Sequence, residues 1–301
     1  MSVRELNITT IIDNTVQALV PTKRVIRQTA SFIKPEDRVV AEHGLSLLIE
    51  ADDTKILFDT GLTPRNTLNN IGALRIPVGE VDLITLSHGH LDHTGSTVGA
   101  LKAIGRPTRV HIHPDLFTKR YLVGARGKKY MIGVPDGEGR GRIEGAGGEI
   151  VTNRGVEEIA RGVYLSGEVK RYTPMESKKL CVEVKGKLIP DPLMDDQSIA
   201  VDLGGRGLAV ITGCAHAGVL NILRHFTEQL NKDVYCLFGG FHLTEAMPPR
   251  ALETAIEGIA EYNPRYVCPM HCVEPSGMVA LVNRFREKYV YNCVGTRFTP
   301  R

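Results

Sequence analysis

The chain has 301 residues, of which 42% are hydrophobic and 24% are charged, and its formal net charge at pH 7 is +3. This balance is typical of a globular protein, and a chain of this length can bury most of its apolar surface without disulfide bonds. The weak charge disfavours nucleic acid or a membrane surface as the main partner.

The N-terminal segment MSVRELNITTIIDN carries Arg4 and Glu5 and lacks the apolar stretch of a signal peptide. No run in the sequence approaches the roughly 18 apolar residues of a membrane span. The six cysteines are scattered without CxxC spacing, which favours reduced thiols. We therefore predict a cytoplasmic protein with no membrane partner.

Short apolar runs alternate with helical patterns in the first half, which favours an α/β architecture. Residues 45–50 and 55–58 predict two paired strands around a turn, and 81–87 predict a strand at the centre of a sheet. A helix is expected over 95–104 and a further strand over 109–113.

The stretch 124–148 interrupts this pattern, since it holds nine glycines and several lysines and arginines without clear periodicity. A stretch of this kind is typical of a functional loop, of a mobile loop or of a plain surface insertion. We predict a basic, glycine-rich insertion in a single domain that spans residues 1–301.

The second half resumes the alternation of strands and helices. Strands are predicted over 162–165, 180–184, 198–203, 207–212, 234–238 and 266–269. Helices are predicted over 219–230, 250–262 and 277–289. Two halves of this kind predict a sandwich of two sheets with helices outside.

The strongest chemical signal is the segment SHGHLDHTG at 87–95, directly after a predicted buried strand. It holds four potential metal ligands within six positions: His88, His90, Asp92 and His93. Neutral imidazole and carboxylate are ligands that zinc and related first-row metals accept. We expect His88 and His90 to converge on one ion, and Asp92 and His93 to face a second.

This HxHxDH pattern resembles the signature of the metallo-β-lactamase superfamily. The turn Asp59-Thr60-Gly61 stands where that superfamily has a DTG turn, whose aspartate supports the metal loop. His271 matches the superfamily's late histidine ligand. The resemblance spans about residues 40–275 and implies an α/β protein with an αβ/βα four-layer sandwich and the metals at one edge of the sheets.

The middle landmark departs from the superfamily pattern. Most members carry a histidine before one strand and a metal-bridging aspartate after it, whereas here 195–198 read DDQS and Cys214 stands at the aspartate position. His216 is our candidate for the missing imidazole ligand. Cys214 is either a thiolate ligand or a small buried residue, and the second interpretation is the commoner fate of a free cysteine.

Four further segments resemble the dihydropteroate-synthase-like branch of this superfamily. They read TGCAHAG at 212–218, GGFHL at 239–243, PMHC at 269–272 and EHGLS at 42–46. That branch includes enzymes similar to the 7,8-dihydropterin-6-methyl-4-(β-D-ribofuranosyl)aminobenzene 5′-phosphate synthase of methanopterin biosynthesis.

Other residues are weaker candidates for substrate binding or for support of the ligands. His242 is expected to contact the substrate or to brace a ligand, and His43 lies in a segment that could line the pocket. The turn 213–218 precedes a predicted helix whose N-terminus could hold a phosphate or carboxylate, with added positive charge from Lys119, Arg120 and Arg171. A phosphorylated substrate is therefore a hypothesis. His111, His113 and His225 show no site pattern.

The resemblance implies that His88, His90 and His216 hold one ion, and that Asp92, His93 and His271 hold another. Zinc is the expected cofactor, as one or two ions, with Mn²⁺ or iron as alternatives. Zinc lowers the pKa of bound water to about 7. We therefore predict a metallo-hydrolase that attacks a small-molecule substrate with a metal-activated hydroxide, with Asp92 as ligand, general base or both.

Three alternatives stay open. In the first, the same site condenses a pterin pyrophosphate with an arylamine in pterin cofactor biosynthesis. The others are a nuclease and a non-catalytic binding module, both disfavoured because the HxHxDH set is intact and the net charge is small. A diiron oxygen reductase is disfavoured because such proteins carry glutamate at the position of His90. The sequence is compatible with a homo-oligomer.

Overall fold

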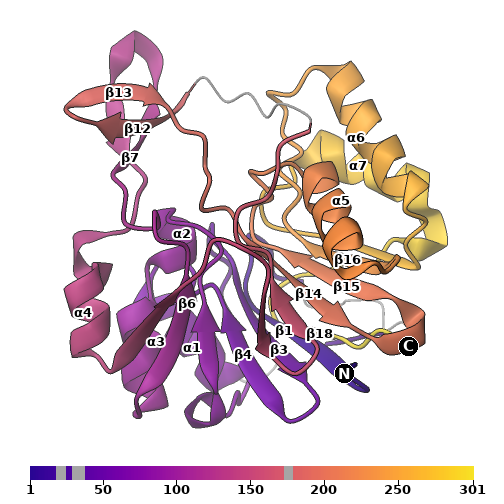
Figure 1. Ribbon diagram of the computed structural model, residues 1–301, viewed down its shortest axis with the longest axis horizontal. Coiled ribbons are helices and arrows are strands. Elements are labelled where there is room, and N and C mark those ends of the chain that lie inside the picture. Colours follow the sequence, from indigo (N-terminus) through magenta and orange to yellow (C-terminus); the bar gives the residue numbers. More distant parts are fainter. Residues whose placement is uncertain (18–24, 29–37, 173–178) are drawn as a thin grey trace.

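Two β-sheets packed face to face form the centre of the protein (Figure 1). The computed structural model describes residues 1–17, 25–28, 38–172 and 179–301. Helices cover the outer face of each sheet, so the layers run helix, sheet, sheet, helix (Figure 1). This is the four-layer αβ/βα sandwich that the sequence predicts, and the fold prediction is confirmed.

The first sheet has eight strands among the described residues. In spatial order they are β2 (Ile26–Gln28), β18 (Thr296–Phe298), β1 (Leu6–Ile12), β3 (Ser46–Ala51), β4 (Thr54–Phe58), β5 (Leu83–Thr85), β6 (Thr108–Ile112) and β9 (Gly148–Thr152). The strands from β4 to β9 are parallel neighbours. Their carboxyl ends therefore meet at one edge of the sheet.

The second sheet has six strands in the described part of the chain. In spatial order they are β10 (Glu157–Ala160), β11 (Val163–Leu165), β14 (Ser198–Asp202), β15 (Leu208–Thr212), β16 (Val234–Gly239) and β17 (Tyr266–Pro269). β15, β16 and β17 run parallel. Each of these strands is followed by a loop that carries a histidine two to four residues after the strand ends.

Helices and short 3₁₀ turns complete the layers. The α-helices are α1 (Pro64–Ala73), α2 (Leu91–Thr94), α3 (Thr97–Ile104), α4 (Arg140–Gly145), α5 (Val219–Leu230), α6 (Pro249–Glu261) and α7 (Pro275–Phe285). The 3₁₀ turns are η2 (Val78–Glu80), η3 (Ala125–Gly127), η4 (Asp136–Glu138), η5 (Gly204–Arg206) and η6 (Arg286–Lys288). No helix in the described ranges is long and apolar enough to cross a bilayer.

Three buried clusters hold the layers together. The central cluster joins inward side chains of both sheets, such as Phe58 of the first and Phe238 of the second. In a second cluster, apolar side chains of α5, α6 and α7 pack against the second sheet. In a third cluster, those of α1, α3 and α4 pack against the first sheet. Burial of this apolar surface, at roughly 25 cal/mol per Å², is the main force that keeps the site-bearing edge in place.

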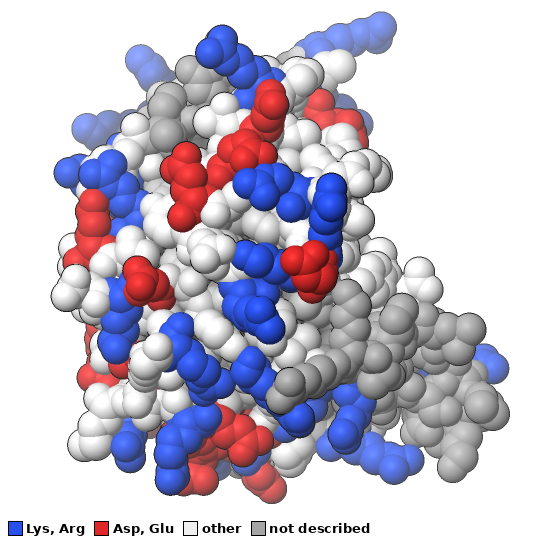
Figure 2. All heavy atoms as spheres, turned by 90° about the vertical axis from the view of Figure 1, so that its right-hand side faces the viewer, with Lys and Arg blue, Asp and Glu red and all other residues white. Residues whose placement is uncertain are grey.

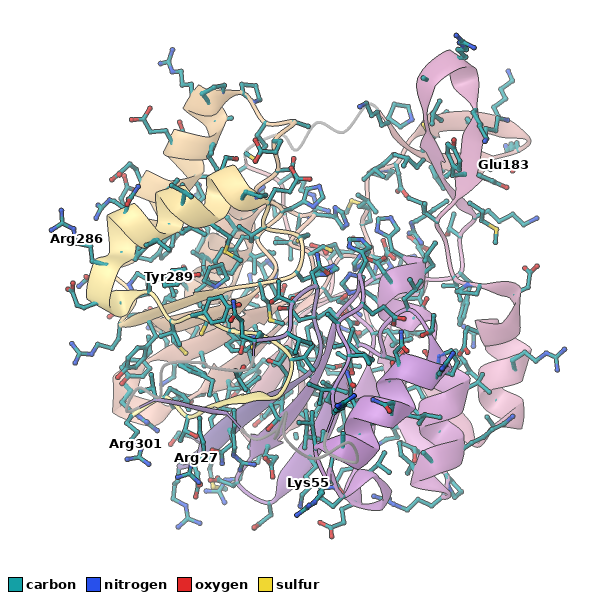
Figure 3. All side chains as sticks on the ribbon, turned by 180° about the vertical axis from the view of Figure 1, so that it is seen from behind. Arg27, Lys55, Glu183, Arg286, Tyr289 and Arg301 are labelled. Atoms are coloured by element: carbon teal, nitrogen blue, oxygen red, sulfur yellow. The ribbon has the colours of Figure 1, made fainter. Side chains whose placement is uncertain are left out.

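A third sheet of four short strands stands off the sandwich (Figure 1). In order its strands are β13 (Lys187–Pro190), β12 (Leu180–Val184), β7 (Arg120–Val123) and β8 (Lys129–Met131). Glu183 lies on this small sheet, away from the body of the molecule, and accepts a hydrogen bond from the Tyr121 hydroxyl at 3.2 Å (Figure 3).

The predicted insertion at 124–148 is divided between two parts of the fold. Its first residues form the hairpin turn and β8 of the small sheet, whereas its last residues form α4 and enter β9 of the first sheet. The high glycine content concealed both elements, because glycine is unfavourable inside helices and strands.

Candidate metal centre

The predicted ligands meet where the carboxyl ends of the parallel strands of both sheets come together. Asp59 follows β4, and the segment 88–93 follows β5. The loops 213–218, 240–242 and 270–272 follow β15, β16 and β17. This is the edge at which open α/β sheets place their ligands.

Three buried imidazoles make the first ligand group, which we call group 1. Ligand-capable atoms of His88, His90 and His216 all lie within 4.8 Å of one another. His88 Nε2 is 2.9 Å from His90 Nδ1. The Nε2 atoms of His90 and His216 are buried and have no hydrogen-bond partner among the described residues. Buried polar atoms are seldom left unpartnered, so this position suits a bound ion.

Asp92, His93 and His271 make the second group, group 2. The Nε2 atoms of His93 and His271 are 3.1 Å apart, and Asp92 Oδ2 lies 3.6 Å from the first and 3.4 Å from the second. His43 adds a fourth ring, with Nε2 at 3.3 Å from Asp92 Oδ2. Three of these side chains are largely buried, whereas the His43 side chain is 68% exposed.

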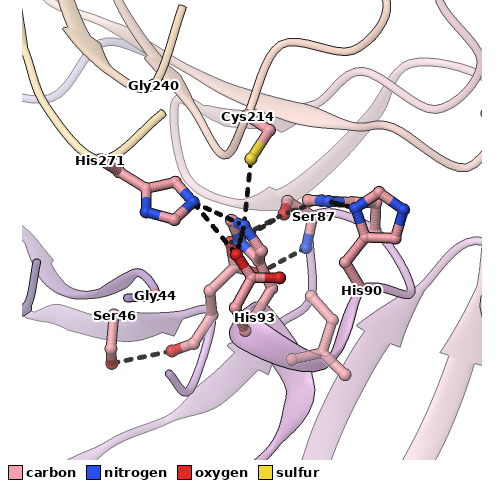
Figure 4. A network of polar contacts seen from close by, with 12 residues as sticks. Gly44, Ser46, Ser87, His90, His93, Cys214, Gly240 and His271 are labelled. Atoms are coloured by element: carbon pink, nitrogen blue, oxygen red, sulfur yellow. Dashed lines mark hydrogen bonds and ion pairs between the residues drawn. The ribbon is translucent and has the colours of Figure 1, made fainter. Parts of the chain in front are cut away.

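Cys214 lies between the two groups (Figure 4). Its Sγ is 3.2 Å from His93 Nε2, and His88, His93 and Cys214 form a further cluster of ligand-capable atoms within 4.8 Å. The Cys214 thiol thus lies beside ligands of both groups, at the sequence position where the superfamily pattern has an aspartate, and could contribute a ligand to a metal held by either group. Our preference for Cys214 as a mere packing residue does not account for this placement.

Asp59 orients two ligands at once, as the resemblance implied. Its Oδ1 accepts from the Ser87 amide at 2.7 Å, and its Oδ2 accepts from Ser87 Oγ at 2.7 Å and from His93 Nδ1 at 2.6 Å. With its hydroxyl proton given to Asp59, Ser87 Oγ accepts from His88 Nδ1 at 2.9 Å. Both rings are thus held in the tautomer that leaves Nε2 free for a metal.

His271 is oriented by the end of β1, which the sequence did not indicate. Its amide donates to Asp13 Oδ1 at 2.9 Å, and its Nδ1 lies 3.3 Å from Asn14 Oδ1. Asn14 Nδ2 donates to the His271 carbonyl at 3.0 Å. The ring therefore directs Nε2 toward Asp92 and His93, and the tautomer follows from the oxygen acceptor at Nδ1.

The electrostatics differ between the two groups. In group 1, burial lowers the pKa of His90 to about 3 and holds the pKa values of His88 and His216 well below their ordinary range. In group 2, burial also acts to lower the pKa of His93, but Asp59 and Asp92 outweigh it and raise the pKa to about 9. The group 1 histidines are therefore neutral rings with free lone pairs, whereas the carboxylates around His93 in group 2 favour positive charge.

The backbone of the site is unusual. Asp59, His242 and His271 are non-glycine residues with φ between +50° and +58°, and Ala215 has φ of +60°. Such conformations are uncommon and gather at functional sites. Gly213 is also required, because a Cβ there would lie 2.3 Å from Ser87 Oγ.

The donor set fits a pair of first-row metal ions. His88, His90 and His216 would hold one, while Asp92, His93 and His271 would hold the other, with Cys214 shared. Imidazole, carboxylate and thiolate are zinc ligands. Burial raises the pKa of the Cys214 thiol, and a bound cation reverses that preference by deprotonating a coordinating thiol.

The weaker candidates fall into two classes. His242 joins the centre, because its ring centroid is 4.4 Å from that of His216. Arg171 does not, since it donates to the carbonyls of Val169 at 2.8 Å and Leu193 at 2.7 Å. Arg120 is buried in ion pairs with Asp191 and Asp195 at 2.8 Å each, so its charge is structural.

The turn before α5 is less open to an anion than the sequence suggested. The Ala217 amide donates to Asp196 Oδ2 at 2.8 Å, so a carboxylate of the chain already occupies it. Cys272 also belongs to the neighbourhood, with its Sγ 3.3 Å from the Cys214 carbonyl and from the His242 amide. From the sequence alone we assign no role to Ser87 or Asn14, and we favour a packing role for Cys272 beside His271 in the segment PMHC.

Comparison with known proteins agrees with this geometry. Residues 39–271 match the family model of the metallo-beta-lactamase superfamily. The chain is 28% identical over 261 residues to the 7,8-dihydropterin-6-methyl-4-(beta-D-ribofuranosyl)-aminobenzene-5'-phosphate synthase of Methanocaldococcus jannaschii, and the match covers 83% of this chain and 87% of the relative. The predicted resemblance to the superfamily and to this branch is confirmed.

Solved structures share the fold. The crystal structure of Tm1679, a metal-dependent hydrolase of the beta-lactamase superfamily, aligns with a TM-score of 0.75 at 24% identity, covering 97% of this chain and 98% of that chain. Zn²⁺-bound PqqB from Methylobacterium extorquens aligns with a TM-score of 0.54 at 12% identity, covering 97% and 99%.

Proposed function

This chain belongs to the metallo-beta-lactamase superfamily, and we propose that it is a metal-dependent hydrolase of a small organic molecule, with zinc in groups 1 and 2. The observation that carries the proposal is the position of Cys214 Sγ between two separate sets of buried ligands. When bound, zinc supplies a Lewis acid that lowers the pKa of water and polarises the attacked group.

The side chains of the chain then have defined tasks. Asp59 and Ser87 keep His88 and His93 in the ligating tautomer, and Asn14 does the same for His271. Asp92 accepts the proton of the attacking water. Its neighbour His43, 3.3 Å away and largely exposed, takes that proton to solvent.

Elemental analysis tests the metal assignment directly. We expect about two metal ions per chain in the wild type and a large loss in the His88→Ala/Asp92→Ala double variant. His225→Gln is the matched control, because His225 lies on α5 and its Nε2 contacts only the Ser166 carbonyl among the hydrogen bonds of the described residues. A wild type that stays metal-free after reconstitution with zinc would refute the proposal.

Activity is tested on phosphoesters, lactones and amides with zinc-loaded protein. We expect turnover of at least one class, lost in the double variant and kept in His225→Gln. The phosphorylated-substrate hypothesis predicts a preference for a phosphorylated compound over its dephosphorylated form. Equal activity on both forms counts against it.

A second candidate is the condensation of a pterin pyrophosphate with an arylamine. The observation that favours it is the 28% identity, over most of both chains, to a protein named as a synthase of a dihydropterin–aminobenzene product. The same ligand groups would serve either reaction, because a Lewis acid assists both departure of pyrophosphate and attack by water.

One assay separates the two candidates. Zinc-loaded protein is incubated with 6-hydroxymethyl-7,8-dihydropterin pyrophosphate, with and without 4-(β-D-ribofuranosyl)aminobenzene 5′-phosphate, the arylamine that matches the relative's product, and phosphate products are measured. Amine-dependent pyrophosphate release supports the condensation, whereas release without amine supports hydrolysis. Absence of release in both mixtures removes the condensation.

We also propose a small-molecule substrate over nucleic acid. The weak net charge of +3 supports this, and on the face that Figure 2 shows the Lys and Arg side chains across the middle have Asp and Glu side chains beside them. Nucleic-acid surfaces are instead marked by a continuous basic patch. A filter-binding measurement with a short RNA and DNA duplex, expected to show no retention at physiological salt, tests this point.

A further inference from the structure

The ligand loop after β5 is attached to the small third sheet by its backbone. The Leu91 amide donates to the Ile132 carbonyl at 2.9 Å, and the Ile132 amide donates to the Arg120 carbonyl at 3.0 Å. His90 also forms an isolated antiparallel bridge with Gly133. Figure 1 shows α2, which begins in this loop, at the base of the small sheet. The small sheet and the ligand loop are therefore in direct contact.

Arg120 lies at the centre of this junction and is only 2% exposed. Its guanidinium forms ion pairs at 2.8 Å with Asp191 through Nε and with Asp195 through Nη2. Its Nη1 donates to the Leu116 carbonyl at 3.0 Å. A buried cation is costly unless it is paired and hydrogen-bonded, so these partners fix the guanidinium in one orientation.

Asp195 connects this buried arginine to the metal centre. Its Oδ1 pairs with Arg120, and its Oδ2 accepts a hydrogen bond from the Gly89 amide at 2.8 Å. Gly89 is the residue between His88 and His90, which are two of the three group 1 ligands. Asp195 is fully buried, and a bond from an amide to a buried carboxylate is stronger than one between neutral groups. The carboxylate therefore fixes the backbone between two ligands.

The close packing around Gly89 also restrains this backbone. A Cβ at this position would lie 2.0 Å from the Leu116 carbonyl oxygen and 2.5 Å from Arg120 Nη1, so only glycine fits. The amide is thus held by Asp195 on one side, and the α-carbon lies against Arg120 and Leu116. A shift of this backbone would move both flanking ligands together.

Asp195 also stands at an informative position in the chain. The segment 195–198 lies where the superfamily pattern has a histidine ligand. Asp195 nevertheless belongs to no cluster of ligand-capable atoms among the described residues. Asp59 orients the ring of His93 through a side-chain contact, whereas Asp195 contacts the main chain of the same loop. The two carboxylates therefore act on different parts of the loop.

We propose that Asp195, held in place by Arg120, is a positioning residue that sets the geometry of group 1 by fixing the Gly89 amide. The inference rests on the proposed function, since it concerns the same metal centre. Arg120 therefore has a task besides stabilising the base of the small sheet, because it holds the Asp195 carboxylate in the orientation that reaches Gly89.

Asp195→Ala and Asp191→Ala are a matched pair of variants that test this proposal. Each removes one of the two carboxylates that pair with Arg120, and the two side chains are 0% and 3% exposed. Both variants are expected to unfold at a lower temperature than the wild type, because Arg120 loses a partner in each. Only Asp195→Ala also removes the acceptor of the Gly89 amide.

Zinc affinity separates positioning from general stability. Competition with a chromophoric chelator gives the affinity of each folded protein for its two ions. We expect Asp195→Ala to bind one ion about 10- to 100-fold more weakly, as is typical when a group that orients a metal ligand is lost. Asp191→Ala is expected to bind both ions as tightly as the wild type.

Cobalt(II) reports the arrangement of ligands independently of affinity, because its visible spectrum depends on coordination geometry. We expect shifted bands in cobalt-loaded Asp195→Ala and the wild-type spectrum in Asp191→Ala. Asp195→Asn is expected to regain part of the zinc affinity, since its amide oxygen can still accept from Gly89. If the alanine variants do not fold, Asp195→Asn and Asp191→Asn give the same comparison, with weaker zinc binding expected only in the first.

The outcomes distinguish this inference from the proposed function. A wild type that binds zinc, with equal losses in the Asp195 and Asp191 variants, would overturn the positioning role and leave the metallo-hydrolase intact. Wild-type affinity and an unchanged cobalt spectrum in Asp195→Ala would do the same. A wild type that binds neither zinc nor cobalt would refute the metallo-hydrolase and the positioning role together.

Discussion

The first sheet supplies three candidate imidazoles and a carboxylate from six consecutive residues, whereas the second sheet supplies His216 and His271 from loops after two different strands. In the first loop, Asp59 joins Ser87, His88 and His93 into one closed set of hydrogen bonds. In the loops of the second sheet, Ala215, His242 and His271 adopt positive φ. His216 Nε2 lacks a hydrogen-bond partner within the described residues.

This difference separates the ligands that one hydrogen-bonded loop holds in place from the ligands that separate loops contribute. A contiguous loop whose rings are oriented by one carboxylate keeps its ligands together whichever ligands the second sheet provides. The separate loops can exchange ligands, and here they place Cys214 at the aspartate position of the superfamily pattern and supply His216 in place of its missing histidine. Variants in each half test this difference.

The largest effect is expected from Asp59→Asn. The amide keeps the shape but places an NH₂ opposite His93 Nδ1, so the ring must protonate Nε2 and lose its ligating lone pair. Loss of a partner that orients a metal-bound histidine typically weakens the metal 10- to 100-fold, and we expect the upper end because two ligands depend on Asp59. Competition with a chromophoric chelator measures the change.

Asp82→Asn is the control for this variant, since Asp82 accepts a bond from the Lys55 amide far along the sheet from the ligands. If Asp59→Asn and Asp82→Asn bind zinc with the affinity of the wild type, the tautomer argument is wrong.

Cys214→Ala tests the junction of the two halves. Without the shared sulfur, we expect one ion to remain in the protein after dialysis and the other to be lost, so zinc falls from about two to about one per chain. Cys236→Ala removes a buried thiol of the central apolar cluster, which belongs to no ligand cluster of the described residues, and should keep both ions. If the Cys214→Ala variant keeps both ions, Cys214 is a packing residue and not a metal ligand.

Asn14→Ala is expected to have a smaller effect, restricted to the second half. It removes the acceptor at His271 Nδ1 and leaves the Asp59 network intact. We expect about tenfold weaker binding of one ion, at the lower end of such losses. A calorimetric titration should show two unequal sites, and an unchanged isotherm would exclude Asn14 as an orienting residue.

The smallest effect concerns a buried histidine outside the centre. Burial, with Arg109 nearby, lowers the pKa of His111 to about 4. In the unfolded chain, His111 binds a proton below about pH 6.5, whereas in the folded chain it stays neutral down to about pH 4. The stability that depends on neutral His111 is therefore fully present above about pH 6.5 and is lost as the pH falls. A pKa difference of this size corresponds to roughly 3 kcal/mol at full strength, and solvent screening reduces the expected contribution to about 1 kcal/mol.

Urea midpoints of metal-stripped protein at about pH 7 and about pH 5 give the measurement. The His111→Gln variant should lose less stability between these pH values than the wild type. A parallel decrease in both proteins would mean that His111 does not titrate differently in the folded state.

Much of the fold could be predicted because apolar periodicity marks buried strands and amphipathic helices. The prediction for 219–230 coincides with α5, and the strand at 266–269 coincides with β17. β1 and α1 were not predicted, since α1 has little apolar character and β1 is buried along its whole length without alternation. Glycines concealed α4 and β8.

The site divides in the same way. His88 to His93 could be predicted because the ligands are adjacent in sequence and follow one strand. The roles of Ser87 and Asn14 could not, because they arise from contacts between segments that are far apart in the chain. Arg120 and Arg171 looked available for a substrate, yet both are satisfied by partners that only the folded chain brings near.

Among the described strands, β13 and β8 are the two edges of the small third sheet, and unpaired strand edges are templates for aggregation. Its edge strands β8 and β13 carry Lys129, Lys187 and Pro190, which oppose pairing with another chain through charge repulsion and the missing amide of proline. Beside them, Tyr130, Met131 and Ile189 are between 44% and 48% exposed. We therefore expect replacement of these lysines with apolar residues to promote edge-to-edge aggregation of the exposed strands at high protein concentration.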